Sequence, residues 1–293
     1  MKSKFLKGLY LLIVSVVGFF LAEVGDFGPV GSTVVKPQYE GDTVSVLSVG
    51  QANSCLISTA GEYCLIDAGY TNTGHTDTVS YLHSIGVKEI ELVVVTHFHS
   101  DHTSDIIDVM KSFDINNMVI PKLTVENMPT ASFFSLFLDT VERKNINLIP
   151  AEKGDEYAVG DGTVTILDDT YNDLTINDTS VATLFRQGDF TFLNTADGEE
   201  EYEKRLLKVF DEKVTMFAAG HHGSSTSNTK KFIKAIKPDF VAISAGKDND
   251  YGHPHKGVTQ LLEKEGIPYG VTFRNGTIVY SITENRLLTE TGG

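Results

Sequence analysis

The sequence predicts a mixed α/β fold in which two β-sheets pack face to face and helices cover their outer faces. Short apolar runs typical of strands occur in two groups along the chain, and helix-like segments follow each group. An apolar sheet face has to be buried against another element, so the two groups are expected to share one core. The chain has 293 residues, 41% of them hydrophobic, which is enough for one sizeable domain or two small ones.

The first group of elements begins near residue 43. Residues 44–49 alternate between apolar and polar side chains, as in a half-buried strand. The runs 54–58 and 63–66 flank Thr59-Ala60-Gly61-Glu62, which is typical of a hairpin turn. The remaining predictions for this group are helices at 77–85, 104–113 and 130–144 and strands at 92–95 and 117–120.

The second group begins with strands predicted at 164–167, 181–185 and 190–193. Near its end, Asn275-Gly276 lies between strand-like residues, and because Asn-Gly favours tight turns, a hairpin is predicted within 272–282. The remaining predictions are helices at 199–207, 228–235 and 257–265 and strands at 214–218 and 240–244.

Residues 1–24 are predicted to lie outside the fold. Three lysines precede an apolar run from residue 8 to 22, which is the pattern of an export signal. The run is shorter than the ~20 residues of a membrane span, and both a cleaved signal peptide and an uncleaved membrane anchor remain open. Either way the protein is expected to be exported, secreted or tethered to the outer face of the cytoplasmic membrane. Residues 25–40 contain several Gly and Pro and are predicted to be a linker, leaving 41–293 for the domain.

The net charge of the chain argues against one class of function. The formal net charge is −15, so the protein gains little from releasing counterions, and broad, non-specific nucleic-acid binding is disfavoured. A single nucleic-acid strand docking at a metal site is not excluded by this argument.

Cys55 and Cys64 lie in neighbouring strand-like runs and are predicted to be small buried residues, with a disulfide as the alternative.

The segment Thr-His-Phe-His-Ser-Asp-His at 96–102 is the most informative part of the chain. Imidazole and carboxylate groups are ligands that ions such as Zn²⁺ prefer, and here they follow a buried strand directly. Alternation along an extended turn would place His97 and His99 on one side, while Asp101 and His102 reach a second point. This arrangement predicts two metal ions close together.

Other ligand-type residues follow strand-like runs elsewhere in the chain. They are Asp67, Asp197, the pair His221 and His222, and the pair His253 and His255. Each is weak evidence alone, because an Asp at the end of a strand is usually a turn former or a helix cap. Together with residues 96–102 they are expected to form one site at one edge of the sheets.

Seven short motifs occur in order between about residues 43 and 282. They are Val49-Gly50-Gln51, Leu65-Ile66-Asp67, 96–102, Asn177-Asp178-Thr179-Ser180, Thr195-Ala196-Asp197, Gly220-His221-His222-Gly223-Ser224 and Tyr251-Gly252-His253-Pro254-His255. With these motifs the chain resembles the metallo-β-lactamase superfamily, and more closely the exported hydrolase domain of ComEC/Rec2-type competence proteins and related phosphodiesterases. The resemblance implies a four-layer αββα sandwich.

The resemblance also implies a two-metal centre with Zn²⁺ or Mn²⁺. His97 and His99 would hold the first metal, Asp101 and His102 the second, and Asp197 would bridge them. One of His221 and His222 would complete the second site, and Asp67 would orient a ligand histidine. Many superfamily members have a third His on the first metal where this chain has residues 177–180, so that site is expected to be ligand-poor. Ser48 and Asn53 depart from the family, which commonly has Asp at both positions.

The implied activity is a metal-dependent hydrolase, most simply an exported phosphodiesterase or nuclease that uses hydroxide generated at the metals. Asp101 is expected to orient the nucleophile, and His253 or His255 to protonate the leaving oxygen, because a His near its usual pKa suits that role. Substrate phosphate would be bound by Asn177, Ser180 and Ser224. A structural turn at the two histidines and a helix cap at Ser224 are the alternatives.

Several other functions remain open on the sequence alone. One alternative is hydrolysis of a carbonyl substrate such as a lactone, thioester or β-lactam. Others are a competence accessory that passes a DNA strand to a separate channel, and a non-enzymatic metal-binding module. The expected substrate is a phosphoester, whether a small molecule, a polymer head group or DNA. Membrane contact is expected only through the N-terminal segment, and no obligate protein partner is evident.

Overall fold

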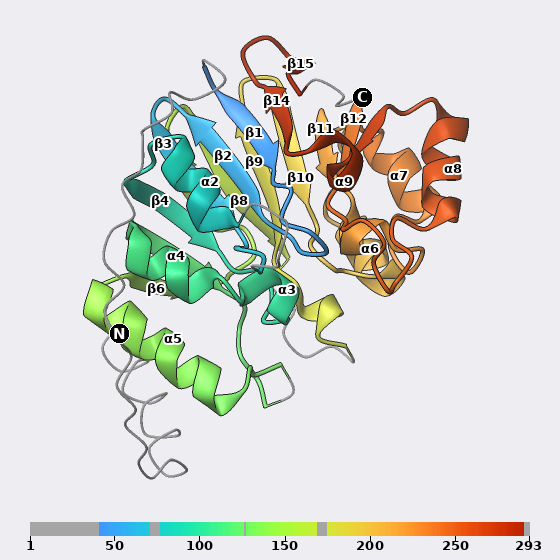
Figure 1. The fold of residues 1–293 in the computed structure, drawn as a ribbon. Helices are drawn as coiled ribbons and strands as arrows, with labels where there is room; N and C mark the ends of the chain where they lie inside the picture. The colour runs from blue at the N-terminus through green and yellow to red at the C-terminus, as the bar shows by residue number, and fades with distance from the viewer. Residues whose placement is uncertain (1–40, 71–76, 126, 169–174, 290–293) are drawn as a thin grey trace. The chain divides into compact units, whose positions relative to one another are not determined.

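Two β-sheets lie face to face, and helices cover the outer face of each (Figure 1). The computed structural model describes residues 41–70, 77–125, 127–168 and 175–289, so the predicted signal segment and linker lie outside the described residues. The predicted fold class is confirmed. Among the described residues, no helix combines the length and the apolar character that a membrane crossing requires.

The first sheet has eight strands in the order β15-β14-β1-β2-β3-β4-β5-β6. Strands β3 to β6 run parallel to one another, whereas the pairs from β15 through β14, β1 and β2 to β3 are antiparallel. The strands are β1 (Thr43–Val46), β2 (Cys55–Thr59), β3 (Glu62–Ile66), β4 (Glu89–Val94), β5 (Asp114–Ile120), β6 (Asn147–Pro150), β14 (Ile278–Ser281) and β15 (Arg286–Leu287).

The second sheet has seven strands in the order β13-β12-β11-β10-β9-β8-β7. Its parallel part runs from β10 to β13, so the carboxyl ends of these strands gather at one edge. The strands are β7 (Glu156–Val159), β8 (Gly162–Asp168), β9 (Ala182–Gln187), β10 (Phe190–Asn194), β11 (Met216–Ala218), β12 (Phe240–Ile243) and β13 (Tyr269–Val271).

Helices cover both outer faces. Figure 1 shows α2 (Thr78–Ser84), α4 (Ile106–Ser112) and α5 (Ala131–Lys144) beside the first sheet. The helices α6 (Glu200–Leu206), α7 (Lys230–Ile236) and α8 (Lys256–Glu265) pack apolar side chains on the second sheet. The described residues also contain four short helical segments: α3 (Ser100–Thr103), η1 (Asn177–Thr179), η2 (Gly220–Gly223) and α9 (Thr272–Asn275).

The core between the sheets contains alternate residues of their strands, as the period of two in a strand requires. Cys55 and Cys64 belong to this core and are diagonal neighbours, because Cys55 pairs with Ile66 while Cys64 pairs with Ile57. Both are free thiols without exposed surface, and burial raises the pKa of each thiol. They are the small buried residues that the sequence predicted.

The predicted hairpin around Asn275-Gly276 is wrong. Residues Thr272–Asn275 form α9, and the chain then crosses from β13 in the second sheet to β14 in the first. Gly276 has φ +70°, so it supplies the backbone conformation for a change of direction, as expected of Asn-Gly. The strand β14 pairs with β1 instead of folding back on β13. Local turn chemistry was predicted correctly, but the pairing partner depends on the packing of two sheets.

The helix predicted at 104–113 begins earlier and is divided into α3 and α4. Asp101 and His102 therefore lie in a helical turn, and the expected extended turn ends at His99, which precedes α3 with φ −68° and ψ 150°. Strands β6, β7, β13 and β15 were not predicted. Each has at most four residues, too few for a clear alternating pattern.

Candidate metal centre

The histidine-rich segment follows β4 and brings its ligand-type side chains to one point. His97 and His99 project side by side, with 3.1 Å between His97 Nε2 and His99 Nδ1. The change from extended backbone to α3 then turns Asp101 and His102 toward a second point. His97 and His102 have no exposed surface, whereas His99 and Asp101 are partly exposed.

Two groups of ligand-type side chains form where the sheets meet. The first group is His97, His99 and Asp197, and the second group is Asp101, His102, Asp197 and His222. Within each group the ligand atoms lie within 4.8 Å of one another. The Asp197 carboxylate belongs to both, since its Oδ1 is 3.2 Å from His102 Nε2 and its Oδ2 is 3.9 Å from His97 Nε2.

Their donor chemistry fits two divalent cations. Imidazole nitrogens and carboxylate oxygens are ligands of Zn²⁺, and Mn²⁺ accepts the same set. His102 Nε2 is buried and lies 3.2 Å from Asp197 Oδ1 without the geometry of a hydrogen bond, although a buried polar atom normally makes one. A cation shared with Asp197 would satisfy this nitrogen. The cluster is therefore compatible with a dinuclear metal site.

Asp67 lies behind His102 and fixes the orientation of its ring. Its Oδ2 accepts a hydrogen bond from His102 Nδ1 at 2.6 Å, which leaves His102 Nε2 directed at the second group. The same carboxylate accepts hydrogen bonds from the Thr96 backbone and hydroxyl at 2.8 Å and from Asn53 Nδ2 at 2.9 Å. Asn53, one of the two departures from the family, therefore donates to the residue that orients a ligand.

Ser48, the other departure, lies away from the two groups. Its backbone amide donates to Thr277 Oγ1 at 3.1 Å, and its hydroxyl donates to the Thr272 carbonyl at 3.3 Å. It therefore holds the segment that crosses between the sheets.

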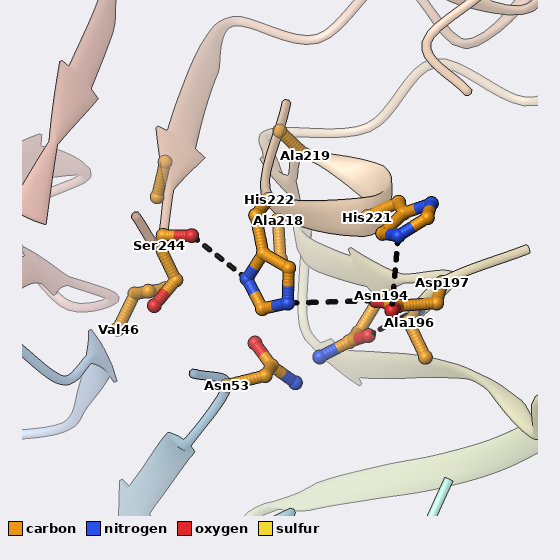
Figure 2. Close-up of a pocket in the computed structure, with 11 residues that line it drawn as sticks. Val46, Asn53, Asn194, Ala196, Asp197, Ala218, Ala219, His221, His222 and Ser244 are labelled. Atoms are coloured by element: carbon orange, nitrogen blue, oxygen red, sulfur yellow. Dashed lines mark hydrogen bonds and ion pairs between the residues drawn. The ribbon is translucent and has the colours of Figure 1, made fainter. Parts of the chain in front are cut away.

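The second sheet supplies Asp197 and His222 from two loops with unusual backbone conformations. Ala196, His221 and His222 have φ values between +47° and +54°, which non-glycine residues rarely adopt. The His221 amide donates to the Ala196 carbonyl at 2.9 Å, so the two loops support each other. Figure 2 shows His222 between Ser244 and Asp197, and the Ser244 carbonyl accepts from His222 Nδ1 at 3.0 Å.

The residues of Figure 2 line a cavity of about 10 Å³, which is the size of a single water molecule. No substrate would fit there. A substrate would approach from the solvent side, where His99, Asp101 and His221 are partly exposed.

The charges of the metal-free site follow from burial and proximity. Burial, with His102 nearby, lowers the pKa of His97, and burial also lowers the pKa of His99. Burial alone would lower the pKa of His102 and His222, but Asp197 and its neighbouring carboxylates raise the pKa of both. Burial would raise the pKa of Asp197, but His102 and His222 hold that pKa well below its usual value. Metal binding would therefore displace protons from His102 and His222.

The structure distinguishes His221 from His222. His222 Nε2 lies 3.2 Å from Asp101 Oδ2, within the second group. His221 belongs to neither group. Its Nε2 is 3.6 Å from Asp197 Oδ2, and its Nδ1 is 3.3 Å from Thr226 Oγ1 and 3.7 Å from Glu199 Oε1.

His253 and His255 have different surroundings. The His253 ring lies 6.2 Å from the His222 ring and 5.6 Å from the His221 ring, and Gln51 Nε2 is 3.2 Å from its Nδ1. Burial and the neighbouring histidines lower the pKa of His253 to about 4, so the expectation of an ordinary pKa is wrong.

His255 Nδ1 accepts from the Ser225 amide at 2.9 Å, and its Nε2 donates to the Tyr251 carbonyl at 3.1 Å. Both of its nitrogens are therefore used within the loop.

The residues expected to bind phosphate are only partly available. Ser180 and Ser224 are 0% and 2% exposed, and Ser224 Oγ accepts from the Thr226 amide at 3.2 Å. Ser180 Oγ lies 3.4 Å from His97 Nδ1, behind the first group. Asn177 is partly buried and donates to Glu199 Oε1 at 3.2 Å. The hydroxyls of the two serines thus contact groups of the protein itself.

Sequence reasoning missed the residues that support the metal groups. Thr96 could have been suspected from its place beside the motif. Asn53 was noticed only as a departure from the family, and Ser244 acts through its carbonyl, which carries no sequence signal. Asn228 and Glu203, which brace the turn that carries His222, lie outside the motifs.

This chain belongs to the metallo-beta-lactamase superfamily, whose model matches residues 47–247. ComE operon protein 3 of Bacillus subtilis (strain 168) is 28% identical over 249 residues, which cover 82% of this chain and 32% of that protein. Competence protein ComA of Neisseria gonorrhoeae is 26% identical over 252 residues, which cover 82% and 32%. The predicted resemblance to ComEC-type competence proteins is confirmed. The chain spans about a third of the length of these relatives.

Solved structures of the same fold are similar at lower identity. The metallo hydrolase Igni18 from Ignicoccus hospitalis KIN4/I has a TM-score of 0.55 at 14% identity, covering 82% of this chain and 99% of that one. The metallo-beta-lactamase fold protein YhfI from Bacillus subtilis has a TM-score of 0.54 at 14% identity, covering 83% and 100%. These similarities establish the fold.

Proposed function

We propose that this protein is an exported, metal-dependent phosphodiesterase. The observation that carries the proposal is the carboxylate of Asp197, which faces both ligand groups at once. Two cations a few ångströms apart suit an in-line displacement at phosphorus, because they lower the pKa of water and neutralise charge on the phosphoryl oxygens. The substrate is a phosphoester, either a small molecule, a polymer head group or DNA.

Asp101 orients the attacking water. Burial would raise its pKa, but the hydrogen bond with His222 and the nearby His102 hold that pKa well below the usual value. The carboxylate therefore stays ionised at neutral pH and accepts a hydrogen bond from water. Its partial exposure places this oxygen on the side from which substrate arrives.

His253 acts in its neutral form. Its lowered pKa keeps the ring uncharged at pH 7, and donation from Gln51 to Nδ1 places the proton on Nε2. The ring then donates a hydrogen bond to a substrate oxygen. His255 has no free nitrogen for such a role, so we assign it to holding the loop that carries His253.

The composition of the first group favours a phosphodiester over a carbonyl substrate. Where many superfamily members are expected to have a third histidine, this chain has residues 177–180, and the Ser180 hydroxyl lies behind His97. The first group is thus limited to two histidines and the shared carboxylate among the described residues. The following experiment distinguishes phosphodiester hydrolysis from hydrolysis of a carbonyl substrate.

The test is hydrolysis of bis(p-nitrophenyl) phosphate by the 293-residue chain, stripped of metal and reloaded with Zn²⁺ or Mn²⁺. We expect a metal-dependent rate that His99→Ala abolishes. The matched control is His83→Gln, since His83 lies on α2 and contacts Phe113 instead of either group. Turnover of a lactone or of a β-lactam, with no turnover of the phosphodiester, would overturn the proposal.

A further inference from the structure

Tyr251 is an exposed aromatic residue that contacts His253, the histidine next to the second metal group. Its relative exposure is 68%, although large side chains of this kind usually bury much of their surface. The other exposed large apolar residues of the described chain are Val125, Leu136 and Val209. Among these four, Tyr251 is the one whose side chain contacts a histidine next to the second group.

A column of three rings leads from Tyr251 to a candidate metal ligand. The Tyr251 and His253 ring centroids are 5.6 Å apart, and their planes differ by 22°. The His253 and His222 ring centroids are 6.2 Å apart, and their planes differ by 23°. Each ring therefore stacks on the next, and the outermost is the exposed phenol of Tyr251.

The loop that presents Tyr251 is held rigidly. Asn249 Oδ1 accepts from the backbone amides of Tyr251 at 3.1 Å and His253 at 2.9 Å. Its amide nitrogen donates to the carbonyls of Gly246 at 2.8 Å and His253 at 2.6 Å. His255 also donates to the Tyr251 carbonyl at 3.1 Å. An aromatic ring held this way loses little conformational entropy when a ligand stacks on it.

We propose that Tyr251 is a stacking subsite for a planar aromatic or heterocyclic group carried by the substrate next to its scissile ester. The inference rests on the proposed phosphodiesterase function and narrows its substrate class. Stacking on an aromatic side chain requires a flat π-face and no particular hydrogen-bond pattern, so the subsite accepts different planar groups. Head groups without a planar part gain nothing from it.

The test compares two diesters that share one leaving group. These are the methyl phosphodiester of thymidine and dimethyl phosphate, and the methanol that each releases is measured by NMR. In Tyr251→Ala we expect KM for the thymidine ester to rise about tenfold, the usual size of one lost stacking contact, with kcat and the hydrolysis of dimethyl phosphate unaffected. Tyr251→Phe keeps the ring and is expected to behave as the unaltered chain. Equal losses for the two esters, or no loss for either, would overturn the subsite.

An equilibrium measurement separates the subsite from catalysis. Titration calorimetry of the full chain with thymidine monophosphate and with methyl phosphate is expected to show tighter binding of the nucleotide, and Tyr251→Ala is expected to remove the difference. If the unaltered chain hydrolyses neither diester but this difference is present and lost in Tyr251→Ala, the proposed function fails and the subsite stands. If both diesters are hydrolysed and the difference is absent, the subsite fails alone.

Discussion

The two halves of the sandwich build the metal centre in different ways. The half that contains β1 to β6 supplies four ligand-type side chains from one segment, residues 97–102, directly after β4. The other half supplies Asp197 after β10 and His222 after β11, with His253 on the loop that follows β12. A compact motif can be recognised from sequence, whereas dispersed ligands depend on the packing of their loops.

The supporting contacts differ in the same way. In the first half, a single buried carboxylate, Asp67, orients His102. In the second half, the turn that carries His222 is braced by Asn228, whose side chain accepts from the Gly220 amide at 2.9 Å and donates to its carbonyl at 2.8 Å. Glu203 in turn accepts from the amides of Asn228 at 2.5 Å and Thr229 at 3.0 Å. The dispersed half therefore relies on a longer chain of contacts.

The largest effect is expected where the halves meet, at Asp197. Asp197→Asn removes the charge shared by both groups, whereas His99→Ala removes a ligand from the first group alone. Loss of a residue that hydrogen-bonds a metal ligand typically costs 10–100-fold in metal affinity or activity. Because Asp197 is itself a candidate ligand of both groups, we expect Asp197→Asn to reduce activity more than about a hundredfold. Metal content by mass spectrometry should fall at both sites. Retention of either metal at full affinity would contradict a shared carboxylate.

The two adjacent histidines of the second half give the next largest effect. His222→Gln is expected to release the second metal while the first group still binds, and to reduce hydrolysis more than about a hundredfold. His221→Gln serves as the matched variant, because its ring lies outside both groups and both metals should remain. Metal stoichiometry after dialysis distinguishes them, and the reverse pattern would show that the ligand was assigned wrongly.

A smaller loss of metal affinity is expected when Asp67, which orients the ligand His102, is changed. Asp67→Asn keeps the shape of the side chain, and Asn tolerates the φ of +58° at this position. It removes the charge that holds His102 Nδ1 protonated, so metal affinity should fall about 10–100-fold. Competition with a chelator measures this affinity. Asp108→Asn, on the exposed face of α4, is the control and should leave it unchanged.

Glu203 is expected to give the smallest effect on activity and to make stability depend on pH. Burial raises its pKa from 4.5 to about 7, although the amides of Thr229 and Asn228 oppose the shift. The folded state therefore binds this proton more tightly than the unfolded state, and its contribution to stability is lost as pH rises toward 7.

Comparison with Glu203→Gln isolates this contribution. The unfolding free energy of the natural chain, measured relative to Glu203→Gln in urea, should fall by up to about 3 kcal/mol between pH 4.5 and 8. Glu201→Gln, on the exposed face of the same helix, should follow the natural chain. A difference between Glu203→Gln and the natural chain that is constant with pH would show that the carboxyl does not titrate in this range.

Much of the fold could be predicted because its signals are local. Alternating apolar side chains located the strands around residues 44–46 and 55–66, and these strands form the inter-sheet core. The segment 97–102 could be recognised as a ligand cluster because its members are neighbours in sequence. The short strands β6, β7, β13 and β15 were missed, since so few residues cannot display a period.

By itself, the sequence determined the α/β class, the order of the motifs and the residue types available to bind metal. Tertiary structure decided that β14 joins the first sheet and that His222 enters the second group while His221 does not. It also decided that both ring nitrogens of His255 form hydrogen bonds within the protein, whereas the His253 ring lies beside the metal centre. The physical reason is that the direction of a side chain in a loop depends on backbone angles. Here those angles are fixed by hydrogen bonds to residues far away in the sequence.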